Sequence, residues 1–224
     1  MSPPVRAVLL DALGTLVELQ PPGPRLREAL RREGFDVSEE QAAAGIAAEI
    51  AYYLGHHLDG RDRGSLEKLR DSCAEELRRG LGVRGLDHGA ARRALLGALE
   101  FTPYPDAVSA LGALRGRGLR LVVASNWDCS LPDWLGQAGL LELVDGVVTS
   151  AQAGAAKPAP EPFLRALELA GVGPGEALHV GDSLENDVEG ARALGIRAVL
   201  IQRHGQLPPG VDAVRSLDRL ASLL

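Results

Sequence analysis

A single carboxylate at the end of an apolar segment is the most informative candidate for chemistry in this chain. Asp11 directly follows the segment 5–10, and the chain then turns through Gly14 and Thr15. A charged side chain that leaves a buried strand into a Gly-Thr turn lies at a sheet edge where chemistry is possible. Two positions after Asp11 the sequence has Leu13, which cannot carry a proton. The pair therefore offers one ionisable carboxylate and, two positions on, a side chain that cannot do acid or base work.

Further polar groups follow predicted strands in the same way. Ser125 and Asn126 come after the apolar segment 119–124, and Asp182 comes shortly after the apolar segment 177–180. Any one of these residues alone is more often a loop or capping residue than a functional one. The carboxyl ends of parallel strands, however, line the ligand crevice of an open α/β sheet. We therefore expect these side chains to converge with the carboxylate described above.

Lysine is so rare in this chain that its positions are informative. Lys68 and Lys157 are its two lysines, and the other 22 of the 24 basic residues are arginine. Lys68 lies in a charged helical stretch, where a solvated side chain explains it. Lys157 precedes Pro158, which restrains it to extended geometry ahead of a predicted helix. We expect Lys157 to supply a compact positive charge to the site.

The spacing of apolar residues predicts the elements that must position these groups. Helical spacing prevails between residues 17 and 100, whereas strands alternate with helices in the later part of the chain. Such alternation implies a parallel sheet covered on both faces. We predict an α/β fold: a Rossmann-like parallel-sheet core with helices on both faces (residues 1–16 and 101–224) and an inserted all-helical cap domain (residues 17–100). The predicted strands are 5–10, 119–124, 144–149, 177–180 and 198–201, and the predicted helices are 24–32, 39–53 with Ser38 as N-cap, 65–79, 87–99, 106–115, 132–138, 160–170, 184–194 and 216–224.

The composition narrows the class of protein. The 224 residues are 46% hydrophobic and carry a formal net charge of -6, which gives no broad electrostatic footprint for nucleic acid. Neither a membrane-spanning segment nor a signal peptide is expected, because no apolar run approaches the ~18 residues that a span needs. Cys73 and Cys129 form no metal-ligand pattern and are expected to be reduced thiols. These features favour a cytoplasmic protein that binds neither nucleic acid nor membranes.

Four segments that contain the polar groups resemble, in order, the four motifs of the haloacid dehalogenase (HAD) superfamily. They read Asp-Ala-Leu-Gly-Thr-Leu from residue 11, Leu-Val-Val-Ala-Ser-Asn from 121, Lys-Pro-Ala-Pro-Glu-Pro-Phe from 157 and Gly-Asp-Ser-Leu-Glu-Asn-Asp from 181. The last two are the more specific. The resemblance covers essentially the whole chain and is closest to the helical-cap (C1) subgroup with an Asp-Ala-x-Gly-Thr motif one. It implies a hydrolase of small phosphorylated or halogenated molecules.

The resemblance also implies roles for individual residues. Asp11 is expected to be the nucleophile, with Ser125 and Lys157 as further catalytic groups. The Ser125 hydroxyl and the Asn126 backbone N–H are expected to bind a substrate oxygen, and Lys157 to hold the nucleophile and an anionic, phosphoryl-type substrate. Thr15 is a further candidate for substrate binding, although it is better explained as fixing the turn that follows Asp11.

A Mg²⁺ ion is the cofactor that the resemblance implies. Its expected ligands are the Asp11 side chain, the backbone carbonyl of Leu13 and Asp182, because Mg²⁺ prefers hard oxygen ligands. Leu13 supplies a carbonyl as well as an aspartate would. Asp187 is expected either to orient the metal shell or to hold Lys157.

Leu13 leaves three functions open. In phosphatases of the superfamily an aspartate at this position is the general acid and base, and its loss typically costs ~10² to 10⁴ in rate unless another acid, such as Asp128 or a cap histidine, replaces it. Dehalogenases also lack this aspartate, because a halide leaves without protonation, but they usually have an aromatic residue there and lack the acidic ligand that is Asp182 here. Phosphonate-cleaving relatives, a variant beside the dehalogenases, also lack this aspartate. They need a Schiff-base lysine in the cap, and the surroundings of Lys68, the only lysine of the predicted cap, do not suit that role. A protein that binds without turnover is the third function.

Several residues keep two interpretations. A cluster at the end of a cap helix could line a substrate pocket, although a partly solvated helix end is the simpler interpretation; it comprises Tyr52, Tyr53, His56 and His57. His179 lies inside a predicted strand and is expected to be structural. Trp127 follows the Ser-Asn pair and fits either a pocket wall or the core.

Overall fold

Two compact units make up the chain. The computed structural model describes residues 3–224, and its first unit consists of Met1–Glu18 and Pro103–Leu224, whereas the second is Leu19–Thr102. We call them the core unit and the helical unit. The sequence placed these boundaries two residues earlier, after residues 16 and 100. The difference arises because the short strands β2 (Val17–Leu19) and β3 (Phe101–Pro103), which pair with each other where the chain passes between the units, were not predicted.

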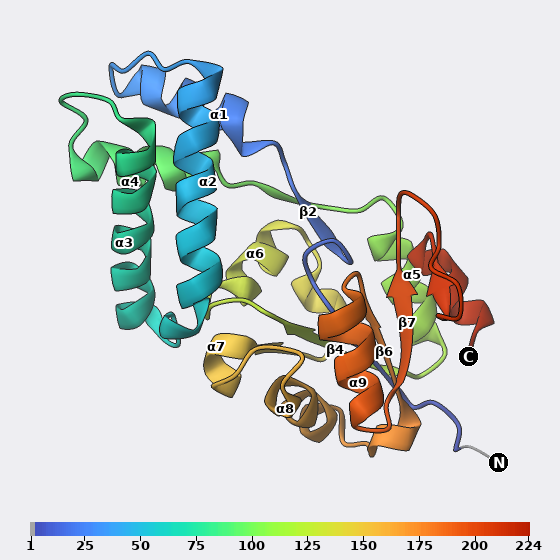
Figure 1. Ribbon diagram of the computed structural model, residues 1–224. Helices are drawn as coiled ribbons and strands as arrows, with labels where there is room; N and C mark the ends of the chain where they lie inside the picture. Colours follow the sequence, from blue (N-terminus) through green and yellow to red (C-terminus); the bar gives the residue numbers. More distant parts are fainter. Residues whose placement is uncertain (1–2) are drawn as a thin grey trace. The chain divides into compact units, whose positions relative to one another are not determined.

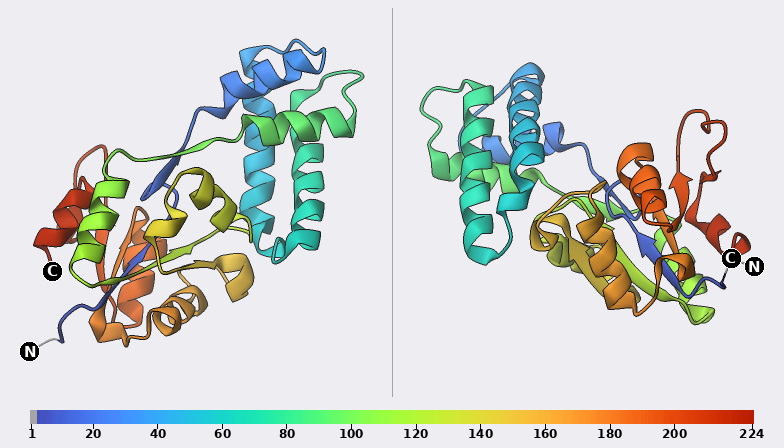
Figure 2. Two further views of the ribbon diagram at one scale, coloured as in Figure 1. Left: turned by 180° about the vertical axis from the view of Figure 1, so that it is seen from behind. Right: turned by 60° about the horizontal axis from the view of Figure 1, so that its bottom comes forward.

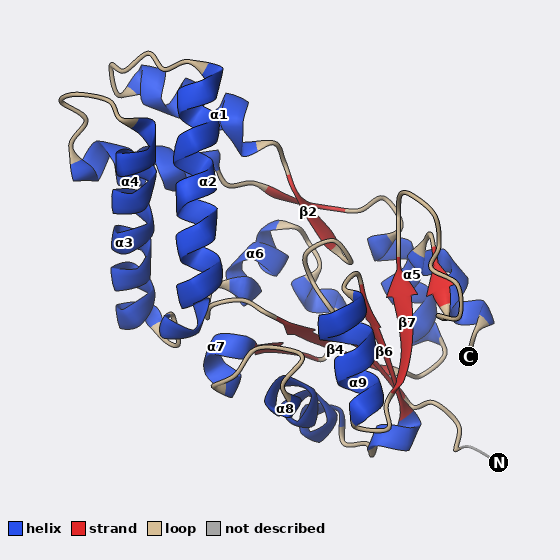
Figure 3. Cartoon of the chain, in the orientation of Figure 1, coloured by secondary structure: helices blue, strands red, loops and turns tan. Residues whose placement is uncertain are grey.

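The core unit contains a parallel sheet (Figures 1 and 3). Its first strand, β1, lies near the centre of the strand order. The strand order is β5-β4-β1-β6-β7-β8, and every pairing is parallel. The α/β prediction is therefore confirmed, and the strand that ends at Asp11 is flanked on both sides. The strands are β1 (Ala7–Leu10), β4 (Arg120–Ser125), β5 (Gly146–Thr149), β6 (Ala177–Gly181), β7 (Arg197–Ile201) and β8 (Ala213–Val214).

Helices cover both faces of this sheet. Leu9 and Val122 pack in one hydrophobic cluster with Phe163 of α8, whereas Val8 and Leu10 are equally buried but point to the other face because strand side chains alternate. Burial on both faces explains why these strands read as continuous apolar runs. The core helices are α5 (Ala107–Gly116), α6 (Leu131–Gln137), α7 (Ser150–Ala153), α8 (Pro160–Ala170) and α9 (Gly190–Ala193).

Two predicted helices differ in form from the prediction. The segment predicted as a helix over 184–194 begins as a π-helical turn, Leu184–Glu189, and only then continues as α9. The closing segment is a 3₁₀ helix over Leu217–Ser222 rather than an α-helix over 216–224. Apolar spacing does not separate these helix types, because they share similar spacing over one or two turns. The strand β8 and the short helix α7 were not predicted.

The helical unit is a bundle of four helices, of which α2 and α3 run side by side in both views of Figure 2. Ser38 caps α2 and forms a capping box with Gln41, as predicted for the N-cap. Gly80 of α3 allows a close approach, because a Cβ at this position would lie 2.7 Å from the carbonyl oxygen of Ala44. The helices are α1 (Pro22–Arg32), α2 (Glu39–His56), α3 (Arg63–Leu81) and α4 (His88–Ala98).

Two expectations from composition can be compared with the fold. Within residues 3–224 no helix combines the length and the apolar character needed to cross a bilayer. Cys73 and Cys129 are not joined by a disulfide, which agrees with the expectation of thiols.

One carboxylate of the helical unit is buried in apolar surroundings. Glu49 of α2 is only 8% exposed, and the Cys73 side chain hydrogen-bonds to its carboxyl. Burial raises the pKa of Glu49 to about 7. Its side chain faces a cavity of about 10 Å³, close to the size of one water, lined by Leu19, Pro22, Leu26, Ile46, Ile50, Leu95, Ala98 and Leu99.

We expect Glu49 to make the helical unit less stable as the pH rises from about 4.5 to 7. The unfolded chain ionises this group near its ordinary pKa of 4.5, whereas the folded unit keeps it protonated up to about pH 7, so that rising pH favours the unfolded state. The loss amounts to about 3 kcal/mol at 1.36 kcal/mol per pKa unit. Urea unfolding followed by circular dichroism should show Glu49→Gln to be more stable than the wild type at pH 8 and similar at pH 4.5. Glu40→Gln, an exposed change on the same helix, is the control; an unaltered pH profile in Glu49→Gln would contradict the assignment.

Candidate functional site

Asp11 lies at the carboxyl edge of the sheet, between the ends of two neighbouring strands. Leu10 pairs with Val123 of β4 on one side and with Val180 of β6 on the other, and the Asp11 backbone N–H donates to the Val180 carbonyl at 2.9 Å. Residues that follow β4 and β6 therefore meet around Asp11. Its side chain is buried, with 9% of the side chain exposed.

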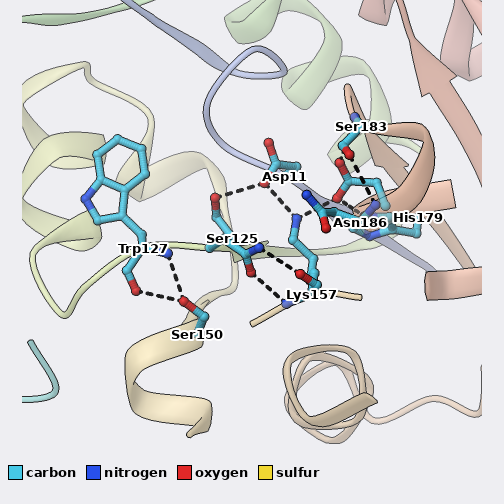
Figure 4. Close-up of polar contacts among 10 residues, drawn as sticks. Asp11, Ser125, Trp127, Ser150, Lys157, His179, Ser183 and Asn186 are labelled. Atoms are coloured by element: carbon cyan, nitrogen blue, oxygen red, sulfur yellow. Dashed lines mark hydrogen bonds and ion pairs between the residues drawn. The ribbon is translucent and has the colours of Figure 1, made fainter. Parts of the chain in front are cut away.

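Lys157 forms ion pairs with two carboxylates, those of Asp11 and Asp187 (Figure 4). Its Nζ lies 2.7 Å from Asp11 Oδ1 and 2.5 Å from Asp187 Oδ1, and its side chain is only 2% exposed. Burial alone would lower the pKa of Lys157, but the two carboxylates outweigh it and raise the pKa above its usual value. The rare lysine that the sequence singled out is thus a buried cation held between the candidate nucleophile and a second aspartate.

Asp187 is engaged on both of its oxygens. Oδ1 accepts from Lys157 and pairs with His179 Nε2 at 2.9 Å, and Oδ2 accepts from the Ser183 backbone N–H at 3.0 Å. Burial would raise the pKa of Asp187, but Lys157 and His179 outweigh it and hold the pKa well below its usual range. Of the two roles expected for Asp187, this geometry favours holding Lys157 over orienting the metal shell.

His179 is a site residue that the sequence analysis missed. It is fully buried in β6, as expected, but its ring also contacts Asp187 and packs edge-on against Phe163, with ring centroids 5.0 Å apart. A histidine in an otherwise apolar strand indicates a polar contact, because a buried imidazole needs a polar partner. The sequence does not identify Asp187 as that partner, since the contact depends on how the turn after β6 folds.

Ser125 and Asn126 contact other site residues. The Ser125 hydroxyl donates to Asp11 Oδ1 at 2.9 Å. The Asn126 side chain brackets the Lys157 backbone: its Nδ2 donates to the Lys157 carbonyl at 2.9 Å, and its Oδ1 accepts from the Lys157 N–H at 2.7 Å. Sequence reasoning assigned a backbone N–H of Asn126 to the substrate; the structure adds a side-chain role, which is to hold the loop that carries Lys157.

Asp182 completes an acidic cluster in which carboxylate oxygens of Asp11, Asp182 and Asp187 lie within 4.8 Å of one another. Burial of its carboxyl and the charges of Asp11 and Asp187 raise the pKa of Asp182 to about 6. Burial likewise raises the pKa of Asp11, and Lys157 acts against it. Crowded carboxylates with raised pKa values are the donor set that a hard divalent cation stabilises. Asp11 and Asp182 therefore fit a Mg²⁺ site.

The turn after Asp11 is built for close approach to Asp182. Gly14 has a positive φ of 79°, and a Cβ at this position would lie 2.1 Å from Asp182 Oδ2. Leu13 is 43% exposed, so its side chain is not part of the core. Thr15 is fully buried, and its hydroxyl has no hydrogen-bond partner in the described part of the chain. Burial favours a role for Thr15 in the turn over contact with a substrate.

The remaining candidates make local contacts. Asp128 is 4% exposed, and its Oδ1 accepts from the Ser130 backbone N–H at 2.7 Å, which ties the proposed substitute acid into its own loop. Trp127 is 6% exposed, and its backbone pairs with the Ser150 hydroxyl (Figure 4). These contacts favour the core interpretation for Trp127.

The aromatic and histidine cluster of the helical unit has the local contacts of a helix end. The rings of Tyr52 and His56 stack with centroids 3.9 Å apart, and His56 Nδ1 lies 2.8 Å from the Tyr52 carbonyl oxygen. His57 is buried and contacts the Leu54 carbonyl oxygen, and Tyr53 packs against it at 6.0 Å. These contacts agree with the simpler of the two interpretations.

Proteins of known sequence similar to this chain carry hydrolase names. Haloacid dehalogenase-like hydrolase domain-containing protein 3 of Bos taurus is 44% identical over 118 residues, which is 52% of this chain and 47% of that protein. The chain thus matches about half the length of these first relatives. Glyceraldehyde 3-phosphate phosphatase of Methanopyrus kandleri is 28% identical over 211 residues, or 89% of this chain and 84% of that protein.

Solved structures and a family sequence model also match this chain to hydrolases. A HAD phosphatase from Thermococcus onnurineus is 28% identical with a TM-score of 0.67, covering 98% of this chain and 97% of that one. L-2-haloacid dehalogenase from Xanthobacter autotrophicus is 25% identical with a TM-score of 0.68, covering 98% of each. The family model described as haloacid dehalogenase-like hydrolase matches residues 5–195. With its four motifs gathered around one carboxylate, the chain belongs to the haloacid dehalogenase-like hydrolases.

Proposed function

We propose that the chain is a Mg²⁺-dependent phosphohydrolase that acts on a small phosphorylated metabolite through an aspartyl-phosphate at Asp11. The acidic cluster carries this proposal: Asp182 adds a carboxylate beside Asp11, within 4.8 Å, in a place where a halide-releasing enzyme needs none. Phosphatase names among similar proteins that match most of the chain support it.

The proposed reaction uses two displacements at phosphorus. A carboxylate oxygen of Asp11 attacks the phosphorus, the ester P–O bond breaks, and the leaving oxygen takes the electron pair. Water then attacks the aspartyl-phosphate, releasing inorganic phosphate and restoring the carboxylate. Bound Mg²⁺, held by the Asp11 side chain, the Leu13 carbonyl and Asp182, would neutralise charge on the phosphoryl oxygens. Lys157 favours the ionised form of Asp11 and holds its carboxylate in place, and Ser125 can turn its single proton from Asp11 to a substrate oxygen.

The proposed substrate preference follows from Leu13. Without a carboxylic acid at this position, the leaving oxygen departs with little help from the core unit. Esters of acidic alcohols or phenols and acyl phosphates are therefore the favoured substrates. We also propose that the helical unit, Leu19–Thr102, is the cap that selects among them, as in helical-cap members of the superfamily.

Dehalogenation of 2-haloacids is the second candidate function. The observation that favours it is Leu13 itself, because a halide leaves without a proton, and dehalogenase structures share the fold at 25% identity. Asp182 opposes it, since an acidic metal ligand has no part in displacing a halide. A protein that binds a phosphorylated ligand without turnover is the remaining alternative.

One assay separates these functions. Purified protein is screened against 4-nitrophenyl phosphate, aliphatic phosphate esters and 2-chloropropionate, each with Mg²⁺ and with EDTA. The proposal expects phosphate release that requires Mg²⁺ and that falls to the uncatalysed rate in Asp11→Asn. Asp36→Asn, an exposed aspartate of the helical unit, is the matched control and should keep full activity. Chloride release insensitive to EDTA would establish the dehalogenase, and equal rates in Asp11→Asn would exclude both enzymes.

A further inference from the structure

The turn that follows Asp11 contains two carbonyls, those of Gly14 and Thr15, that accept from no backbone N–H of residues 3–224. The Ala12 carbonyl accepts from three successive N–H groups, those of Thr15, Leu16 and Val17, at 3.3, 2.8 and 2.9 Å, and Gly14 N–H donates to the Val17 carbonyl at 2.8 Å. The donors within the turn are thus used elsewhere. Backbone carbonyls away from bulk water need donors, which a side chain can supply.

Arg203 is the residue that supplies these donors. It lies just after β7, and its Nε donates to the Gly14 carbonyl at 3.3 Å while its Nη2 donates to the Thr15 carbonyl at 2.6 Å. Its side chain is 12% exposed. The planar guanidinium is suited to this task because it presents several donors in fixed directions, which an ammonium does not.

Arg203 is itself held on two further sides. Its Nη1 pairs with Asp106 Oδ2 at 3.1 Å, and its guanidinium carbon lies 3.6 Å from the centre of the Tyr104 ring. Asp106 in turn accepts from the Ser216 hydroxyl and the Leu217 N–H, each at 2.8 Å. The ion pair, the aromatic contact and the two hydrogen bonds to carbonyls together hold the Arg203 guanidinium in one orientation.

We propose that Arg203 is a positioning residue that fixes the turn 12–16 and, through it, the Leu13 carbonyl beside Asp11. The expected effect of Arg203 on Mg²⁺-dependent hydrolysis rests on the proposed function, whereas its expected effect on amide hydrogen exchange does not. Leu13 immediately precedes Gly14, whose carbonyl Arg203 holds, so freedom at Gly14 and Thr15 moves the Leu13 carbonyl as well. Groups that orient metal ligands in this way typically contribute about 10- to 100-fold to metal affinity or activity.

Two measurements test this role. In Arg203→Ala we expect the Mg²⁺ concentration for half-maximal 4-nitrophenyl phosphate hydrolysis to rise about 10- to 100-fold, with KM for the ester changed by less than about twofold. Millimolar guanidinium should restore part of the lost rate. Without metal or substrate, hydrogen exchange of the amides of residues 12–17 should become at least about tenfold faster. Arg203→Lys keeps a cation for Asp106 but cannot span both carbonyls, so it should fold as the wild type does and still show both effects.

Arg215→Ala is the matched control, because this exposed arginine also donates to a backbone carbonyl, that of Gly205 at 2.9 Å, in the same part of the chain. A wild-type protein that hydrolyses no ester would refute the proposed function, and amide exchange would then decide on Arg203 alone. Unchanged exchange and unchanged Mg²⁺ dependence in Arg203→Lys, or equal effects in Arg215→Ala, would overturn the inference.

Discussion

Lys157→Met is expected to reduce phosphate release by at least about 10²- to 10³-fold, as the loss of a preorganised electrostatic group at a reacting oxygen does. It should also destabilise the core unit. The Lys157 side chain is 2% exposed and lies between the buried carboxylates of Asp11 and Asp187, which would both lose this ammonium as their ion-pair partner. Removing one partner of a buried ion pair typically costs about 3–5 kcal/mol, because the remaining charge stays in the protein interior.

The measurement is urea unfolding in EDTA together with a rate assay at saturating Mg²⁺. Lys68→Met is the natural control, because Lys68 is the other lysine of the chain and is exposed on α3. The destabilisation should shrink as the pH falls, since protonation removes the repulsion between the two carboxylates. The double change Lys157→Met with Asp187→Asn should recover part of the lost stability but none of the activity. A Lys157→Met protein as stable and as active as the Lys68→Met protein would refute the role of this ion pair.

Leu13→Asp is expected to raise turnover of phosphate esters with poor leaving groups by about 10²- to 10⁴-fold, the usual value of general acid catalysis. The change adds a proton donor two residues from Asp11 and should cost little stability, because the Leu13 side chain is 43% exposed. The dependence of rate on the pKa of the leaving alcohol should become shallower in the variant. Aryl phosphates, which leave readily, should gain much less than alkyl phosphates.

Leu13→Asn distinguishes the effect of a proton donor at position 13 from the effect of a polar side chain there. It has nearly the shape of the aspartate but no titratable group, so it should leave alkyl phosphate turnover at the wild-type level. The two variants are compared across a series of phosphate monoesters in the presence of Mg²⁺. If Leu13→Asp gains no more than Leu13→Asn, either another group already supplies the proton or the site does not cleave phosphate esters.

Much of the fold was predictable because the strands are short, apolar and bounded by polar turns. Burial on both faces made β1 and β4 continuous apolar runs, and α8 begins and ends where Pro160 and the αL residue Gly171 place its limits. The separate two-stranded sheet of β2 and β3 was not predicted, because three-residue strands carry no pattern of their own. The π-helical turn Leu184–Glu189 contains Asp187, whose hydrogen bond with Lys157 is a contact that apolar spacing does not encode.

The site was predictable to the extent that its residues follow strands. Asp11, Ser125 and Asp182 come from strand ends, and parallel strands bring their ends to one edge. The contacts of Asn126 with the Lys157 backbone join residues 31 positions apart and depend on the loop geometry between β5 and α8. Arg203 gave no signal at all, because one arginine among 22 is distinguished only by what it touches.

The acidic cluster also determines how an anion meets this protein. With all groups ionised, three aspartates and one lysine leave the cluster with two net negative charges, on a chain whose formal net charge is -6. A divalent cation brings that local charge to zero, whereas without it the cluster repels a phosphate ester before any contact forms. Encounter with substrate should therefore slow steeply at low ionic strength when the cation is missing, and hardly at all when it is bound. From the charge of these three carboxylates we therefore expect a metal ion to bind before the substrate does.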